Sequence, residues 1–220
     1  MTLQHVNLLF QLIVFLFAIS FHESAHAWMA NRCGDPTARM LGRITLNPIK
    51  HIDPIGTILL PVVAIFAHIP VLGWAKPTPV NPSNFRHPVR DDILTSVVGP
   101  LSNFLVAAVA VVLLTVVSAT SATGHAIVID GVVNGDSVLV PIALLLFALL
   151  QINVVLGVFN LIPVPPLDGS HVLRHFLSGS ALAAYDRIGF FGLLLLVYFG
   201  GGLLSRLISP VMSFFLYFIR

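Results

Sequence analysis

Residues 22–26 read HESAH, which is the HExxH spacing of a zinc site. Two histidines four positions apart share one face of a helix, so His22 and His26 can bind a single zinc ion. Glu23 lies beside them, where a carboxylate can act as a general base. The competing interpretation is three polar side chains at a membrane surface. The metal site is favoured, because ionisable groups in an apolar helix are costly and usually functional.

A catalytic zinc ion needs a third protein ligand and an open position for water. Asp168 is the best candidate, because it follows the proline-rich stretch 163–166 at the end of a long apolar run. Prolines end a helix, and Gly169 permits a sharp turn, so this carboxylate can leave the helix axis. A simple helix cap at Asp168 explains the local sequence as well.

The composition is that of an integral membrane protein. Hydrophobic residues make up 57% of the chain and charged residues 9%, with a mean hydropathy of +0.96. A soluble domain carries charge at roughly 25% of positions, so lipid must solvate much of this surface. A net charge of +2 without a basic stripe argues against nucleic acid as a partner. The N-terminal run lacks the basic region and cleavage site of a signal peptide, which predicts a retained helix.

The sequence predicts an all-α, polytopic helical bundle with about five to six hydrophobic segments. The apolar runs cover residues 6–30, 55–74, 93–119, 138–162 and 189–220. Pro54, Pro61 and Pro70 make the second run a candidate re-entrant element. The loose alternation of residues 39–47 predicts a short β element near the active site. One domain over residues 1–220 leaves no room for a PDZ or CBS domain.

Basic residues predict the orientation. The loop 120–137 has no Lys or Arg, whereas many basic residues follow the first run and others follow the fourth. By the positive-inside rule, the N-terminus then lies outside and the metal site faces the cytoplasmic side. The basic residues in question are Arg32, Arg39, Arg43, Lys50, Lys76, Arg86, Arg90, Arg174 and Arg187.

Three motifs in order resemble the site-2 protease family of intramembrane zinc metalloproteases. They are FHESAHA at 21–27, SVVGPLSNF at 96–104 and FNLIPVPPLDGSHVL at 159–173. GWAKPTPVNP, at residues 73–82, looks like the mark of a subgroup.

The resemblance implies a role for each matching residue. Asp168 corresponds to the third zinc ligand, beside His22 and His26, and Asn160 to a residue that helps to bind substrate or the oxyanion. Asn103, in the G-P-x-x-N element, lies on a core helix and is a candidate partner of the metal ligands. The expected protein holds one zinc ion per chain in a cell membrane of prokaryotic type. It cleaves transmembrane segments of other proteins.

Several assignments stay open. His51 is a candidate partner of the site or an interfacial histidine, and His171 and His175 resemble a ligand pair without a base. A substrate helix must unwind for hydrolysis, and residues 39–47 are the predicted edge on which it pairs as a strand. A membrane metal-binding or transport protein is the alternative function, although no repeated halves are visible. A catalytically inactive scaffold ranks last, because every expected catalytic residue is present.

Overall fold

The computed structural model describes residues 3–59, 63, 74–131 and 137–219. These residues form helices and irregular connections, with no strand among them. The α-helices are α1 (Leu3–Cys33), α2 (Thr37–Met40), α4 (Pro88–Thr120), α5 (Ala122–Val128), α6 (Leu139–Asn160), α7 (Asp168–Arg174), α8 (Gly179–Phe199) and α9 (Gly201–Tyr217). Short helical turns cover Pro48–Lys50, Pro54–Leu59 and Pro82–Asn84.

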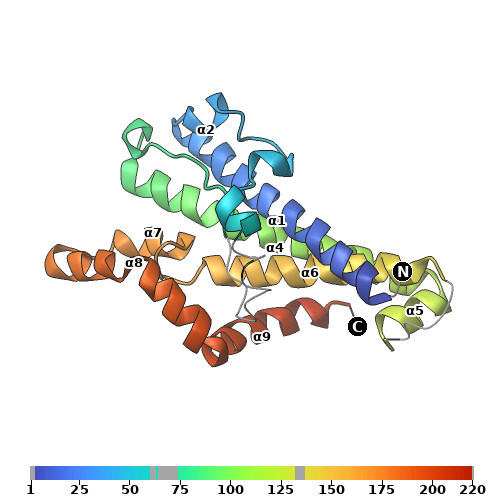
Figure 1. The fold of residues 1–220 in the computed structure, drawn as a ribbon. Helices are drawn as coiled ribbons and strands as arrows, with labels where there is room; N and C mark the ends of the chain where they lie inside the picture. Colours follow the sequence, from blue (N-terminus) through green and yellow to red (C-terminus); the bar gives the residue numbers. More distant parts are fainter. Residues whose placement is uncertain (1–2, 60–62, 64–73, 132–136, 220) are drawn as a thin grey trace.

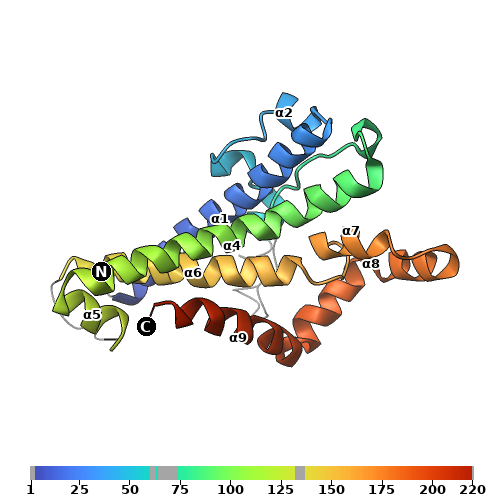
Figure 2. The ribbon, with the colours of Figure 1, turned by 180° about the vertical axis from the view of Figure 1, so that it is seen from behind.

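Three long helices, α1, α4 and α6, lie side by side and form the body of the molecule (Figures 1 and 2). Helix α4 runs against the direction of the other two. The C-terminal ends of α1 and α6 therefore lie at the same end of the bundle as the start of α4. Segments that are far apart in the sequence, the end of α1 and the residues after α6, are brought together there.

The long helices are apolar on their outer faces as well as inside. Leu101, Leu105, Val109, Val112 and Val116 are large exposed residues at intervals of three and four along α4, so they form one outward stripe. A stripe of this length is typical of a surface that lipid or another protein covers. Val6–Cys33, Pro88–Thr120 and Leu139–Asn160 are long and apolar enough to cross a membrane, and the protein is an integral membrane protein.

The main core lies between α4 and α6, with α5 and α9 against its edges. Leu114, Leu150 and Val154 are almost fully buried there. Helix α8 bends by 64° after Gly189, whose positive φ of 45° suits glycine. Its two halves count as a fourth span if they cross as one unit.

The predicted all-α class is therefore confirmed for the described residues, but two finer expectations are not. Among the described residues, three helices, or up to four if the bent pair is one span, are long and apolar enough to cross a membrane, so the five to six hydrophobic segments are not confirmed. Of the second run, Pro54–Leu59 is a single π-helical turn, and most of the rest lies outside the described residues.

The β element predicted at residues 39–47 was wrong. Helix α2 extends to Met40, and turns follow. Gly42 has a φ of 64°, which interrupts an extended strand. Asn47 then caps the next helical turn by accepting a hydrogen bond from Ile49 N at 3.1 Å. The alternating pattern did not predict the backbone here, because turn and cap residues determine the conformation of this segment.

One irregular segment, residues 74–81, passes beside α1 and is called the strap below. Backbone hydrogen bonds join Trp74 N to Gly56 O and Lys76 N to His51 O, at 3.2 and 2.9 Å. Arg43 is buried and donates to the carbonyl oxygens of Lys76 and Pro77. The strap is therefore fixed by contacts along its length, although it is neither helix nor strand.

Candidate metal centre

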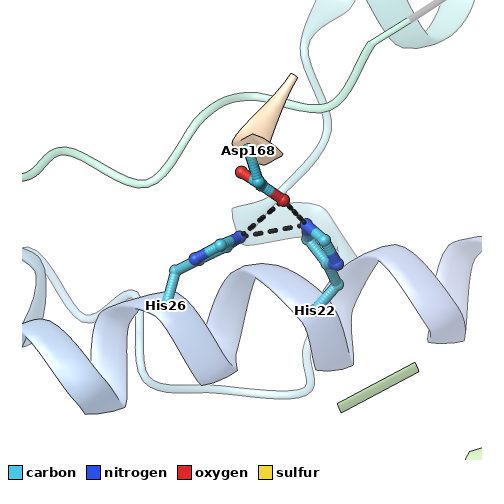
Figure 3. Close-up of side chains that lie close together, drawn as sticks. All are labelled: His22, His26 and Asp168. Atoms are coloured by element: carbon cyan, nitrogen blue, oxygen red, sulfur yellow. Dashed lines mark hydrogen bonds and ion pairs between the residues drawn. The ribbon is translucent and has the colours of Figure 1, made fainter. Parts of the chain in front are cut away.

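His22 and His26 lie one turn apart on α1 and are both buried. Their Nε2 atoms are 3.0 Å from each other (Figure 3). The carboxylate of Asp168 completes a cluster of three ligand atoms that all lie within 4.8 Å of one another. Asp168 Oδ2 is 3.2 Å from His22 Nε2 and 3.4 Å from His26 Nε2.

Asp168 reaches this position because helix α6 ends at Asn160 and the proline-rich stretch follows. The chain turns back through Ile162 to Leu167, and α7 then starts at Asp168 itself. Gly169 allows the turn: a Cβ atom there would lie 2.2 Å from the carbonyl oxygen of Leu161. Asp168 therefore stands in the first turn of α7, but its side chain points to the histidines instead of capping that helix.

The tautomer of His26 follows from its partner. His26 Nδ1 lies 2.6 Å from the carbonyl oxygen of Thr95, which can only accept a hydrogen bond. His26 Nδ1 must then carry the proton, and in the neutral ring the lone pair is on Nε2.

The tautomer of His22 follows from a chain of amides. Asn153 Nδ2 donates to the carbonyl oxygen of Leu149 at 2.8 Å, so Asn153 Oδ1 faces Asn103. Asn103 Nδ2 donates to Asn153 Oδ1 at 2.9 Å, which leaves Asn103 Oδ1 to accept from His22 Nδ1 at 2.7 Å. Asn103 and Asn153 are fully buried. The lone pair of His22 is therefore on Nε2 too.

These residues fit a zinc ion. Two imidazole lone pairs and a carboxylate oxygen converge, and Asp168 Oδ2 is buried without a hydrogen-bond donor. Three lone pairs at such distances repel one another unless a positive charge lies between them. Two His nitrogens and one carboxylate oxygen are the ligand set of hydrolytic zinc sites, with hydrogen-bonded partners behind the histidines.

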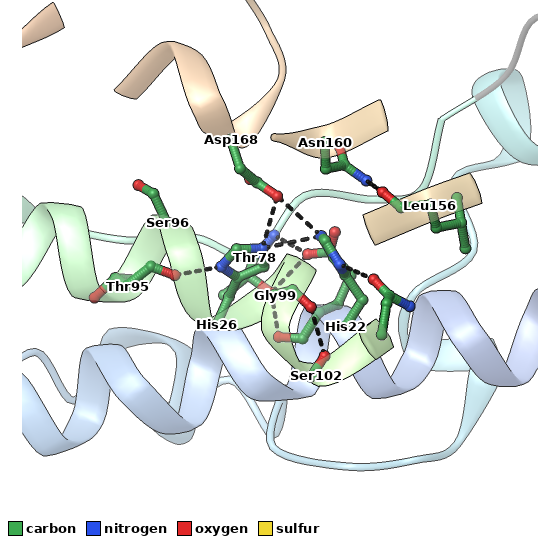
Figure 4. A network of polar contacts seen from close by, with 12 residues as sticks. His22, His26, Thr78, Thr95, Ser96, Gly99, Ser102, Leu156, Asn160 and Asp168 are labelled. Carbon is green, nitrogen blue, oxygen red and sulfur yellow. Dashed lines mark hydrogen bonds and ion pairs between the residues drawn. The ribbon is translucent and has the colours of Figure 1, made fainter. Parts of the chain in front are cut away.

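Gly99 on α4 leaves the space for both rings (Figure 4). A Cβ atom at this position would lie 2.2 Å from His26 Nε2 and 2.7 Å from His22 Cε1. Helices α1 and α4 therefore approach each other closely at the metal site only because residue 99 has no side chain.

The carboxylate of Glu23 is held from the strap. Its Oε2 accepts a hydrogen bond from Thr78 N at 2.8 Å and lies 2.8 Å from Thr78 Oγ1. The same hydroxyl is 2.9 Å from the backbone oxygen of Glu23. Thr78 appears beside the two histidines in Figure 4.

Two cavities meet at the cluster of ligand side chains formed by His22, His26 and Asp168. Glu23 and Asp168 line both cavities. One, of about 250 Å³, is mainly apolar and includes Phe15, Trp74 and Asn160 among its lining residues. The other, of about 240 Å³, has a lining of mixed polarity that includes His26, Asp92, Ser96 and His171. The cluster of His22, His26 and Asp168 thus lies between a mainly apolar chamber and a more polar one.

The other two predicted site residues, Asn160 and His51, form no hydrogen bond with the histidines of the cluster or with Asp168. Asn160 lines the apolar chamber, and its Nδ2 donates to Leu156 O at 3.1 Å. His51 is buried with its Nε2 2.9 Å from Thr45 O. Burial holds the pKa of His51 below its usual value, although the hydrogen bond to Thr45 acts against this. It supports the loop under the strap and contacts no metal ligand among the described residues.

His171 and His175 do not form a second metal site with each other. His175 Nε2 lies 2.7 Å from Asp92 Oδ2, and His171 Nδ1 lies 3.9 Å from the same oxygen. Both rings thus join α7 to the start of α4.

Three residues that contact the site were not predicted, and each of them contacts a residue far away in the sequence. Thr78, Thr95 and Asn153 lie 55, 69 and 50 positions from the residues they contact. Asn153 is an amide in a strongly apolar helix, which was the one available signal, although the same helix also carries Gln151 and Asn160.

The fold and the site define a membrane-embedded metal centre of the zinc-hydrolase kind. The pattern of peptidase family M50 matches residues 10–199, and the chain therefore belongs to this family, the site-2 proteases. No solved structure gives a significant match.

Two curated proteins are similar over most of the chain. "Putative zinc metalloprotease YwhC" of Bacillus subtilis (strain 168) is 36% identical over 202 residues, which are 91% of this chain and 84% of that protein. "Putative zinc metalloprotease Rip2" of Mycolicibacterium smegmatis is 32% identical over 179 residues, 80% of this chain and 61% of that protein.

Proposed function

We propose that this zinc metalloprotease hydrolyses peptide bonds within or near transmembrane segments of membrane proteins. His22, His26 and Asp168 hold one zinc ion per chain, and Glu23 is the general base. The observation that carries the proposal is the convergence of three lone pairs next to Glu23, on a helix long enough to span a bilayer.

The chain's own residues supply the proton transfers. A zinc ion in this site supplies a Lewis acid that acidifies water and polarises the peptide carbonyl. Glu23 takes the proton of the attacking water on its carboxylate and delivers it to the leaving amine. Asn103 and the carbonyl oxygen of Thr95 hold the two imidazoles in the tautomers that keep both Nε2 lone pairs available.

Asn160 is proposed to bind substrate or the developing oxyanion. Its side chain shares the apolar chamber with His22 and Asp168, and only one of its two amide hydrogens is used by Leu156 O. The second N–H is available to an oxygen on the substrate, where a donor stabilises charge that develops during the reaction.

The substrate is proposed to lie across both chambers, with apolar side chains in the first and more polar ones in the second. Segment 39–47 lacks the strand on which the expectation of substrate pairing rested. Room for an unwound peptide beside the metal comes from the chambers themselves.

The topology is part of the proposal. The N-terminus lies outside, and the metal site faces the cytoplasmic end of the bundle, in a cell membrane of prokaryotic type. The Lys and Arg residues around the site and their absence from the loop 120–137 support this orientation.

The test measures zinc content together with cleavage of a model transmembrane substrate in detergent. Wild type is compared with Glu23→Gln and Asp168→Ala. We expect about one zinc per chain in wild type and Glu23→Gln, less in Asp168→Ala, and cleavage by wild type alone.

Turnover by Glu23→Gln at the wild-type rate would contradict its role as the base. Zinc bound normally by Asp168→Ala would remove Asp168 from the ligand set. If wild type does not cleave the substrate and Glu23→Gln still carries zinc across vesicle membranes, the result would favour the transport alternative.

A further inference from the structure

Glu23 has two carboxylate oxygens, and the strap engages one of them. Thr78 N and Thr78 Oγ1 both lie 2.8 Å from Oε2. Both are ordinary hydrogen-bond distances. No Lys or Arg among the described residues forms an ion pair with Glu23, so Thr78 supplies the main fixed donors to this carboxylate.

The backbone around Thr78 is unusually restricted. Pro77 and Pro79 flank it, and each proline fixes its own φ. Pro79 also keeps Thr78 out of the helical region. The threonine therefore loses little conformational freedom when it contacts Glu23.

The strap is also fastened on either side of Thr78. On one side, Arg43 donates to the carbonyl oxygens of Lys76 and Pro77. On the other side, Asn81 N donates to the fully buried Asp35 at 2.7 Å. Thr78 is thus attached to a rigid support, which a residue that orients a catalytic group requires.

We propose that Thr78 is a positioning residue for the general base: its backbone N–H and its hydroxyl hold Oε2 of Glu23, so that Oε1 is presented to the reacting water. This inference rests on the proposed function, in which Glu23 accepts the proton. It assigns a catalytic purpose to the strap, whose sequence otherwise marks only a subgroup.

The test replaces the threonine with side chains of similar size. Thr78→Val keeps the backbone N–H and the volume but removes the hydroxyl, whereas Thr78→Ser keeps the hydroxyl. Thr57→Val is the matched control, because Thr57 Oγ1 also anchors the strap, through Trp74 O at 2.8 Å, without touching Glu23. For each full-length protein in detergent, kcat, KM, zinc content and thermal unfolding are measured beside wild type and Glu23→Gln.

We expect Thr78→Val to lower kcat about tenfold, which corresponds to about 1.4 kcal/mol in the barrier, with little change in KM. Zinc content and the unfolding midpoint should stay close to those of wild type. Thr78→Ser should recover most of the rate, and Thr57→Val should keep a kcat near that of wild type.

The inference is overturned if Thr78→Val turns over as fast as wild type or faster, while wild type cleaves and Glu23→Gln does not. An equal loss of kcat in Thr57→Val also overturns it, because the hydroxyl would then matter only for the strap. No cleavage by wild type, or full cleavage by Glu23→Gln, instead overturns the proposed function, and the role of Thr78 with it.

Discussion

At the residue scale, the close approach of α1 and α4 at Gly99 determines whether the two histidines can meet. Gly99→Ala places a methyl group within 2.2 Å of His26 Nε2. Because both rings must then move, we expect the affinity for zinc to fall about tenfold or more, as when partners of metal ligands are disturbed. Zinc content after dialysis against graded chelator measures this.

Gly201→Ala is the control for Gly99→Ala, since nothing lies within 4 Å of the Cβ atom it adds. It should keep the zinc affinity of wild type. Unchanged zinc binding in Gly99→Ala would mean that α1 and α4 separate easily at the metal site.

The amide chain from α6 to His22 gives a second prediction. Asn153→Leu has a similar volume but cannot orient Asn103, so the proton of His22 is no longer directed to Nδ1. We expect metal affinity to fall about 10–100-fold, the usual effect of losing such a partner. Competition with a zinc chelator tests this, with the exposed Gln151→Leu as the control on the same helix. Equal affinity in both variants would contradict the prediction.

His22, Glu23 and His26 could be proposed from the sequence because metal chemistry needs fixed residue types at fixed spacing, whereas Asp168 was favoured by its resemblance to a family motif. The structure brings His22, His26 and Asp168 together. Thr78 and Asn153 could not be proposed from the sequence, because a threonine or an amide has many structural uses. Only the packing of the strap and α6 against α1 and α4 decides which use applies.

At the element scale, the apolar runs of α4 and α6 predicted their helices well, since length and composition are sufficient for a span. The prediction of a strand at residues 39–47 was wrong because this segment is too short for its pattern to determine the structure. Its alternation is short, and Gly42 and the cap at Asn47 determine its turns instead.

Asp35 joins the end of α1 to the strap and to the turn Pro82–Asn84. Thr37 Oγ1, Asn81 N and Asn84 Nδ2 donate to its carboxylate at 2.5, 2.7 and 2.8 Å. Burial favours the protonated form, but these hydrogen bonds outweigh burial and hold the pKa of Asp35 below its usual value. A lowered pKa in the folded state adds stability above the unfolded pKa of about 3.9, and that stability is lost as the pH falls further.

We therefore expect Asp35→Asn to lower the stability by about 1–3 kcal/mol at pH 7, because buried donors lose their acceptor. The gap to wild type should shrink as the pH falls from about 5 to 3. Thermal unfolding of both proteins across this range measures it. The exposed Asp130→Asn serves as the control, and a constant gap at all pH values would disprove the assignment.

At the scale of the whole molecule, three ends meet at one side of the bundle. Helices α1 and α6 finish there, and α4 starts there, so Asp168 comes next to His26 without a long connection. The opposite side holds α5 and the N-terminal end of α1 (Figure 1). The position of the His–His–Asp cluster toward one end of the bundle is a direct consequence of this alternating direction.

The sidedness of this arrangement gives the last prediction. The loop 120–137 lacks Lys and Arg, whereas Arg174 and Arg187 follow Asp168, so the metal end should face the cytoplasm. Cys33 is the only cysteine, and Cys33→Ala provides a background for single cysteines at the exposed Thr123 and Ser178. A membrane-impermeant maleimide added to intact bacterial cells should label Thr123→Cys at least about tenfold faster than Ser178→Cys, because the bilayer excludes a charged reagent. Both should react after permeabilisation, and faster labelling of Ser178→Cys in intact cells would show the opposite orientation.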